Sequence, residues 1–280
     1  INSAKEVLVS GKVNYWTGSK CKIFEENFAN YVGSQYSISV ANGSLALSLA
    51  YLACGIGYGD EVITSPRSFV ATASSICLLQ AKPVFADVDI DSGNITAESI
   101  EKVITKKTKA ISVVHFAGWP ANMKEIKLLA SRYGIYLIED CAQAHGAMIE
   151  DEGIFRSVGS FGDIAAWSFC QDKIISTGGE GGMVTTSNKK LWEKMWSMKD
   201  HGKDYYLACN KEHPPGFRWL HSNLGSNFRL TEFQSAIGIE QIKLLDNWTA
   251  LRDRNARIII DSLKELENVR IPLPSDEYQH

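Results

Sequence analysis

Hydrophobic residues recur along the chain in two alternating kinds of segment. Short, continuous apolar runs are typical of buried strands, and segments whose apolar positions return every three or four residues are typical of helices. The runs predict strands at 37–40, 61–64, 83–86, 110–115, 136–139, 163–169 and 183–186. The periodic segments predict helices at 21–31, 45–54, 71–79, 96–104, 123–133 and, as one long bridge, 231–266.

Strands that alternate with helices predict an α/β fold, with a mostly parallel sheet sandwiched by helices. In such sheets ligands bind beyond the carboxyl ends of the strands. Polar residues stand at several of these predicted ends, at 42–44, 65–69, His115, Asp140 and Ser168. We therefore expect one chemical site along this edge of the sheet.

Lys173 is the first candidate for a reactive group. Gly178, Gly179, Gly181 and Gly182 follow it and permit a tight loop around a ligand. Apolar neighbours could remove part of the hydration of the lysine, which favours the neutral amine that acts as a nucleophile. A solvated surface lysine beside a turn is equally compatible with this segment alone.

Two further positions carry chemistry that complements an amine. Gly43 and Ser44 open a predicted helix, whose free N–H groups and dipole suit a phosphate, although an ordinary helix cap has the same pattern. Asp140 ends an apolar predicted strand, and a carboxylate at such a nearly buried position needs a cationic or hydrogen-bonding partner. A helix cap or a buried salt bridge is an alternative explanation for this residue. A lysine, a carboxylate and a phosphate cradle together fit pyridoxal phosphate, which carries an aldehyde, a pyridine nitrogen and a phosphate.

Composition narrows the class of protein. The 280 residues, 45% hydrophobic and 22% charged, are typical of a soluble globular protein with one large α/β domain. A net charge of −3 gives no basic field for nucleic acid or an anionic membrane. We expect a cytoplasmic protein, because no membrane span or signal-peptide core is evident. The six cysteines are widely spaced, which predicts neither a zinc site nor a disulfide framework.

Several short motifs complete the sequence evidence. In chain order they are WTG at 16–18, NGSLAL at 42–47, SFVAT at 68–72, HFAGWP at 115–120, EDCAQAHG at 139–146, SFCQDK at 168–173, GEGG at 179–182, GSNFR at 225–229 and EFQSAIG at 232–238. This ordered set resembles the sugar aminotransferases of the DegT/DnrJ/EryC1/StrS family, fold type I enzymes that use pyridoxal phosphate. The resemblance covers nearly the whole chain.

The resemblance implies roles for four residues around the cofactor ring. Lys173 would bind pyridoxal phosphate covalently and then shuttle the substrate proton. Asp140 would keep the pyridine nitrogen protonated, and Gln143 would hydrogen-bond the phenolic oxygen. Phe69 would stack on the ring face, although a phenylalanine is more often part of a core.

The resemblance also implies how the phosphate is held. Ser44, the Leu45 amide and the hydroxyl of Ser168 would bind it, although Ser168 could equally be a satisfied strand hydroxyl. Asn227 matches a family asparagine that reaches the phosphate of the neighbouring subunit. A homodimer is therefore implied.

The implied reaction transfers an amino group from an amino acid, glutamate, to a nucleotide-linked ketosugar, in amino-sugar, surface-polysaccharide or antibiotic-sugar biosynthesis. Dehydratases of the family carry histidine in place of the lysine, so Lys173 favours transamination. A sugar dehydratase and a non-catalytic regulator that binds pyridoxal phosphate remain alternatives. Cys170 departs from the family pattern, since many relatives have histidine there.

The resemblance divides the chain in two. We expect residues 1–240 to form the large domain that binds pyridoxal phosphate. Residues 241–280 would be a helical bridge and the start of a small C-terminal domain, most of which this chain lacks. Trp119, His201, Lys203 and the loop 205–219 are candidate sugar contacts, with a packed surface loop as the alternative.

Overall fold

A seven-stranded sheet forms the centre of the structure, a computed structural model that describes residues 1–209 and 220–279. Its strands are, in spatial order, β1 (Tyr36–Val40), β9 (Gly182–Thr186), β8 (Ile164–Ser168), β5 (Tyr136–Asp140), β4 (Thr108–Val114), β2 (Glu61–Thr64) and β3 (Lys82–Phe85). β9 is antiparallel to both of its neighbours, and the other pairs in this sheet are parallel. The predicted mostly parallel sheet is confirmed.

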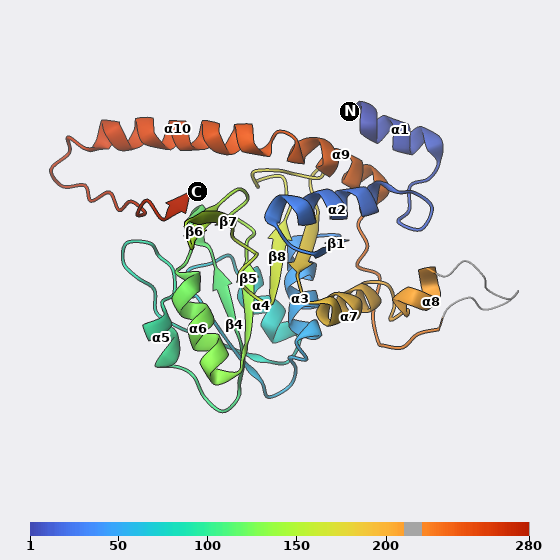
Figure 1. Ribbon diagram of the computed structural model, residues 1–280, viewed down its shortest axis with the longest axis horizontal. Helices are drawn as coiled ribbons and strands as arrows, with labels where there is room; N and C mark the ends of the chain where they lie inside the picture. The colour runs from blue at the N-terminus through green and yellow to red at the C-terminus, as the bar shows by residue number, and fades with distance from the viewer. Residues whose placement is uncertain (210–219, 280) are drawn as a thin grey trace, which may run out of the picture.

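Helices cover both faces of this sheet, as Figure 1 shows. One face carries α3 (Gly43–Ala53), α4 (Ala71–Leu78) and α7 (Lys189–Lys199), whose apolar side chains share one buried cluster with the strands. The other face carries α2 (Lys20–Val32), α5 (Ala97–Glu101) and α6 (Met123–Tyr133), which belong to a second cluster. The predicted α/β sandwich is therefore the observed architecture.

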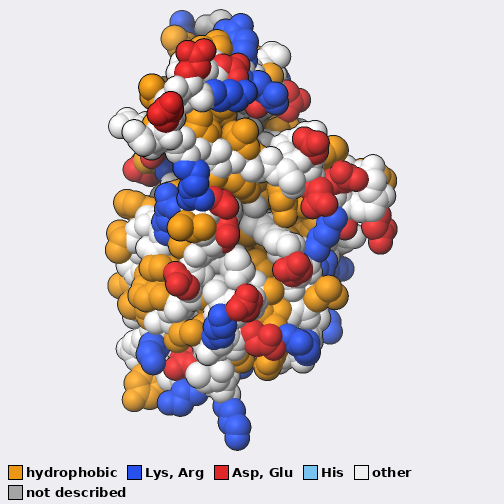
Figure 2. Space-filling model, turned by 90° about the vertical axis from the view of Figure 1, so that its left-hand side faces the viewer, with side chains coloured by type: hydrophobic (Ala, Val, Ile, Leu, Met, Phe, Trp, Pro, Cys, Tyr) orange, Lys and Arg blue, Asp and Glu red, His pale blue; other side chains and the backbone are white. Residues whose placement is uncertain are grey.

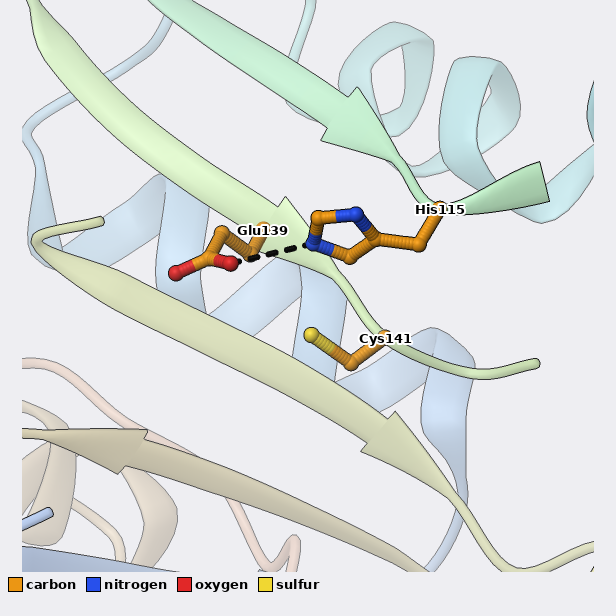
Figure 3. Close-up of side chains that lie close together, drawn as sticks. All are labelled: His115, Glu139 and Cys141. Atoms are coloured by element: carbon orange, nitrogen blue, oxygen red, sulfur yellow. Dashed lines mark hydrogen bonds and ion pairs between the residues drawn. The ribbon is translucent and has the colours of Figure 1, made fainter. Parts of the chain in front are cut away.

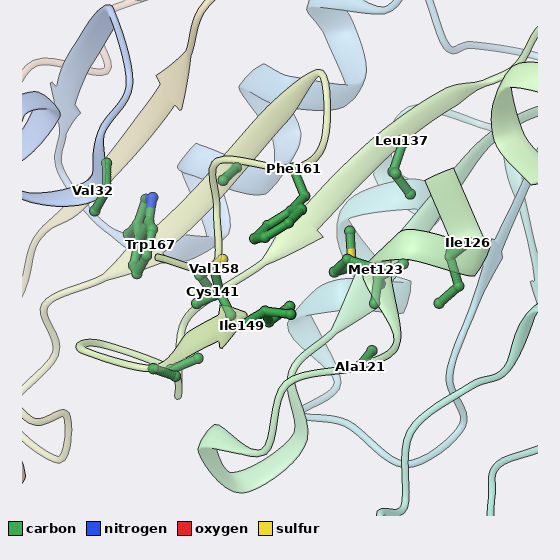
Figure 4. Close-up of a cluster of buried hydrophobic side chains, with 14 of the residues drawn as sticks. Val32, Ala121, Met123, Ile126, Leu137, Cys141, Ile149, Val158, Phe161 and Trp167 are labelled. Atoms are coloured by element: carbon green, nitrogen blue, oxygen red, sulfur yellow. The ribbon is translucent and has the colours of Figure 1, made fainter. Parts of the chain in front are cut away.

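Successive residues of the central strands supply the two clusters alternately, because neighbouring side chains of a strand point to opposite faces. In β5, Leu137 belongs to the cluster drawn in Figure 4 and Ile138 to the other cluster. In β8, Trp167 and Ala166 divide in the same way. The indole N–H of the buried Trp167 donates to Thr185 Oγ1 at 3.1 Å, so its polar atom is satisfied. This packing fixes the position of the ends of β5 and β8.

Some elements of the described chain were not predicted by the hydrophobic pattern. They are α7, α1 (Asn2–Ser10), η1 (Phe116–Gly118), β6 (Met148–Asp151), β7 (Ile154–Ser157), α8 (Tyr205–Cys209) and β10 (Tyr278–Gln279). β6 pairs with β7 in a hairpin and with β10 in a separate small sheet. The predicted helix 96–104 is shorter than expected, because α5 ends at Glu101 and the chain continues in turns.

The predicted bridge 231–266 consists of two helices, α9 (Glu232–Ile242) and α10 (Leu245–Leu263). Thr231 begins α9 in a capping box with Gln234. α10 begins at the fully buried Leu245 and runs along one end of the molecule, extending beyond the central sheet (Figure 1). The expected division between residues 240 and 241 falls inside α9 and stays a prediction.

The surface carries charged and apolar side chains side by side. On the face drawn in Figure 2, acidic and basic side chains are interspersed with apolar ones. A search of the helices in residues 1–209 and 220–279 finds none with the length and apolar content that a membrane crossing requires.

Candidate active site

Lys173 lies on the tight loop that joins β8 to β9. The hydroxyl of Thr177 donates to the Glu180 carbonyl at 2.6 Å, and a Cβ at Gly181 would come within 2.0 Å of that hydroxyl oxygen. Glycine is therefore required for this turn. The Lys173 side chain is 17% exposed, and its Nζ donates to Asp172 Oδ2 at 2.9 Å. The loop presents a largely buried amine beside the end of β8.

Asp140 ends β5, the strand next to β8, and pairs in register with Val114 on one side and Ala166 on the other. Its carboxylate is buried and accepts hydrogen bonds from Thr72 Oγ1 at 2.7 Å and from the Ala142 N–H at 3.2 Å. Within residues 1–209 and 220–279 no cation pairs with it, and burial raises the pKa of Asp140. A protonated ring nitrogen would supply the missing positive charge.

Gln143 follows β5 and is fixed by a neighbouring turn. Its Oε1 accepts the N–H of Ala117 at 2.8 Å. Ala117 has φ +54°, a left-handed conformation that is uncommon for residues other than glycine. Because the side-chain oxygen is occupied, the amide nitrogen is the group that would donate to a phenolic oxygen.

The first turn of α3 forms a cradle at the end of β1. Asn42 Oδ1 accepts the Leu45 N–H at 2.9 Å, so the Leu45 amide already has a partner, whereas Gly43 and Ser44 have no acceptor within the helix. A Cβ at Gly43 would lie 2.7 Å from the Cβ of Ser168. The close approach that glycine permits brings the Ser168 hydroxyl beside the free N–H groups.

Phe69 follows β2 and lies before α4, and its side chain is 69% exposed. Since β2, β4, β5 and β8 are consecutive in the sheet, the structure brings the ends that carry Phe69, Asp140, Gln143, Ser168 and Lys173 to one edge. An amine, an unpaired buried carboxylate and a helix N-terminus form a donor set that fits pyridoxal phosphate.

His115 was expected at this site, and the structure corrects that expectation. Figure 3 shows its ring turned toward Glu139 and Cys141. His115 Nε2 lies 3.0 Å from Glu139 Oε2, and His115 Nδ1 accepts the Ala121 N–H at 3.1 Å. Because Nδ1 accepts a hydrogen bond, it carries no proton. The ring proton is therefore on Nε2, which donates to the Glu139 carboxylate.

The cluster of His115, Glu139 and Cys141 resembles a set of metal ligands, with ligand atoms within 4.8 Å of one another. Burial opposes ionisation of Glu139, but hydrogen bonds from His115 and from backbone N–H groups hold the pKa of Glu139 below its usual value. Those N–H donors belong to Gly159, Phe161 and Gly162. Burial also raises the pKa of the Cys141 thiol well above its usual value. We assign the cluster a structural role.

Asn227 is exposed, and its segment is anchored to the end of β1. The Phe228 carbonyl accepts the Ala41 N–H at 2.9 Å, and Asp200 and Asn227 form a β-bridge. Asp200 is fully buried and accepts a hydrogen bond from Arg229 Nη1 at 2.7 Å. The segment therefore holds Asn227 rigidly while leaving its side chain accessible.

The candidate sugar contacts differ from one another in burial, and one of them is not free to bind a sugar. Lys203 is buried, donates to Asp200 Oδ1 at 3.0 Å and lies over the ring of Trp16, so it is a structural residue. His201 is exposed and has φ +59°. Trp119 is partly buried beside η1. Of the loop 205–219, residues 205–209 form α8, and 210–219 lie outside the described residues.

One residue that supports the site, Thr72, was missed, whereas Asn42 was expected among the polar residues 42–44. Thr72, which bonds Asp140, lies one helical turn after Ser68, and the two hydroxyls are 2.8 Å apart. Asn42 directly precedes the predicted helix and has the residue type of an N-cap. The motif SFVAT contains Thr72, so motif context was the signal that could have identified it.

Lys199, the last residue of α7, is fully buried beside the Asn227 segment. Its Nζ lies 3.6 Å from the centroid of the Tyr15 ring and 3.9 Å from Asp200 Oδ2, and it has no hydrogen bond within the described residues. Burial lowers the pKa of Lys199 to about 8, against the opposing charges of Glu25 and Asp200. The unfolded chain therefore binds more protons than the folded chain between about pH 8 and 10.5.

This shift predicts a measurable pH dependence. Relative to Lys199→Met, the wild-type free energy of unfolding should increase by about 2 kcal/mol between pH 7.5 and 9.5, because the buried charge is lost. Urea unfolding of both proteins at the two pH values measures this difference, and other titrating groups cancel. Exposed Lys106→Met is the control, for which no such change is expected. A constant difference between wild type and Lys199→Met would contradict the prediction.

Comparison with known proteins agrees with the chemistry of the site. The sequence matches the DegT/DnrJ/EryC1/StrS aminotransferase family over residues 1–280. An aminotransferase structure from Psychrobacter cryohalolentis is 51% identical, with a TM-score of 0.93 over 97% of this chain and 69% of that chain. GDP-perosamine synthase of Escherichia coli O157:H7 is 37% identical over 93% of this chain and 66% of the relative. A structure of NtdA from Bacillus subtilis with bound cofactor PMP is 29% identical, with a TM-score of 0.84 over 99% of this chain and 60% of that chain.

The fold is that of a pyridoxal phosphate-dependent aminotransferase, and the donor set of the site fits that cofactor. The chain belongs to the DegT/DnrJ/EryC1/StrS aminotransferase family. The resemblance and the cofactor expected from the sequence are thereby confirmed. The roles of individual site residues stay predictions.

Proposed function

We propose that this protein transfers the amino group of glutamate to a nucleotide-linked ketosugar, in the cytoplasm, with pyridoxal phosphate as cofactor. The observation that carries the proposal is the pair of Lys173 and Asp140 at the ends of neighbouring strands. The names of relatives such as GDP-perosamine synthase support a nucleotide sugar as the acceptor.

In the proposed mechanism, pyridoxal phosphate supplies an electron sink when bound. The amine of Lys173 would hold the cofactor, and when free of it the Nζ would be the group that moves the substrate proton. Asp140 holds the proton on the ring nitrogen, Gln143 orients the ring through the phenolic oxygen, and Phe69 covers one ring face. Ser44, the Leu45 amide and Ser168 hold the phosphate; Leu45 would have to share its N–H with Asn42.

A homodimer is part of the proposal. The side chain of Asn227 is exposed in the single chain, and its segment is held by Asp200 and Ala41, as contact with a second subunit would require. In the dimer, Asn227 would complete the phosphate site of the neighbouring subunit. Mixed dimers of Lys173→Ala and Asn227→Ala chains test this arrangement, because one of their two sites would be intact and should restore activity that neither variant has alone.

The experiment that tests the function combines two measurements on the holoenzyme. The absorption spectrum should change from the lysine-bound form of the cofactor to its amino form when glutamate is added. Mass spectrometry should then show one amino group incorporated into a GDP- or dTDP-linked ketosugar. A product without nitrogen would instead support the sugar dehydratase, and the absence of any reaction would support the non-catalytic regulator.

A further inference from the structure

Arg67 presents an exposed cation on the edge of the sheet that carries the site. It lies between β2 and α4, two residues before Phe69, and its guanidinium carbon is 4.3 Å from the centroid of the Phe116 ring. Within residues 1–209 and 220–279 its side chain makes no hydrogen bond or ion pair. A cation–π contact uses the face of the guanidinium, so the N–H groups on its edge remain available.

The surroundings hold this side chain in place. A Cβ on Gly93, which has φ +69°, would come within 2.6 Å of Arg67 Nη1, so glycine leaves the space that the guanidinium occupies. Phe116 begins η1, and its N–H donates to Asn94 Oδ1 at 3.0 Å. The loops that follow β3 and β4 therefore position the two sides of the contact.

Carboxylates of the same loop are already engaged. Asp91 pairs with Arg270, whose Nη2 also donates to the Ile90 carbonyl at 3.0 Å. Asp89 Oδ1 accepts the N–H of Asp91 at 3.1 Å and that of Ser92 at 2.8 Å. These carboxylates leave the charge of Arg67 available to a ligand.

Two segments at this contact, the loop that carries Arg67 and the turn that carries Phe116, are connected to the candidate active site. The next residue, Ser68, is linked through the Thr72 hydroxyl to Asp140, in steps of 2.8 and 2.7 Å. The turn that carries Phe116 is linked through the Ala117 N–H to Gln143. The segments that carry Arg67 and Phe116 are therefore each connected to a residue predicted to contact the cofactor ring, Asp140 or Gln143.

We propose that Arg67 is a specificity-determining residue that binds an oxyanion of a substrate. The inference rests on the proposed function, whose two substrates both carry such a group: the diphosphate of the nucleotide-linked sugar and a carboxylate of the amino donor. The guanidinium edge matches either anion with two parallel hydrogen bonds, which a lysine ammonium cannot form. The contact with Phe116 limits the freedom that such binding would otherwise cost.

The test compares wild-type holoenzyme with Arg67→Met and Arg67→Lys. Calorimetry gives the Kd of GDP and of dTDP, and single-turnover absorbance gives the glutamate concentration for half-maximal conversion of the cofactor. One of these quantities should rise about 10- to 100-fold in Arg67→Met, with a smaller rise in Arg67→Lys, because charge-assisted hydrogen bonds are lost. Arg132→Met is the matched control: Arg132 is an exposed arginine over Tyr133, at the opposite edge of the sheet.

The outcomes separate the two anions. A weaker nucleotide Kd with unchanged glutamate conversion assigns Arg67 to the diphosphate, and the reverse assigns it to the donor carboxylate. If wild type binds nucleotide and converts glutamate, and Arg67→Met matches it in both, the inference alone is overturned. If wild type neither binds nucleotide nor converts glutamate, the proposed function is overturned and the inference with it.

Discussion

Lys173→Ala is expected to abolish turnover, with a fall in kcat of more than about 10⁴-fold. One group contributing general acid–base catalysis accounts for about 10² to 10⁴-fold, and this amine is also the proposed covalent anchor. Its side chain is largely buried on a loop whose geometry is set by Thr177 and Gly181. Two other buried lysines are engaged elsewhere: Lys199 is enclosed beside Tyr15 and Asp200, and Lys203 donates to Asp200 Oδ1.

The measurement pairs turnover with the absorption spectrum of the loaded protein. Lys173→Ala should bind pyridoxal phosphate without the absorption band of the lysine-bound form, while Lys106→Ala, at an exposed lysine remote from the site, should match wild type. The thermal midpoint shows whether Lys173→Ala remains folded. A folded variant that keeps wild-type turnover would exclude Lys173 from the mechanism.

Helices and strands were predicted most accurately in segments whose own hydrophobic pattern determines their structure. The expected helix 123–133 is α6, whose buried residues recur with helical spacing, and the expected strand 61–64 is β2. The helix α7, KKLWEKMWSMK, was missed although its apolar residues at 191, 192, 195 and 196 recur with helical spacing. Its last residue, Lys199, departs from the pattern because it is buried. Pattern rules assign a lysine to the surface, whereas here the Tyr15 ring and Asp200 compensate its burial.

The site was predicted in its chemistry but not in its orientations. Motif order identifies Asp140 and Lys173 in the sequence, but the sequence predicted no strand order; the structure is what places the strand of Asp140 beside β8. The direction of a side chain at a strand end depends on partners from distant segments. His115 turns toward Glu139, a contact that has no signal in the local pattern, whereas the bond from the Leu45 N–H to Asn42 is a local helix cap that the residue type indicates.

Asp140→Asn is expected to lower kcat by about 10³-fold with a small change in KM. The proposed role of the carboxylate is to keep a positive charge on the ring nitrogen while the reaction develops negative charge, and an amide cannot stabilise that proton. Removing one such electrostatic group costs about 10² to 10³-fold in other enzymes. Asp261→Asn is the control, since Asp261 is an exposed carboxylate of α10 whose ion-pair partner, Lys264, is also exposed, and the change should alter kcat by less than about threefold.

Stability of the cofactor-free protein separates this role from a structural one. Burial raises the pKa of Asp140 and outweighs the opposing charge of Lys173, so the ionised carboxylate is a net cost to the folded state of the unloaded protein. An isosteric amide removes that charge; its oxygen can accept from the Ala142 N–H and its NH2 group can donate to the Thr72 hydroxyl, which can turn to donate to Ser68. The thermal midpoint of unloaded Asp140→Asn at pH 7.5 should therefore equal or exceed that of wild type. A lower midpoint together with lost activity would mean that Asp140 maintains the fold. An unchanged kcat would mean that another group protonates the ring.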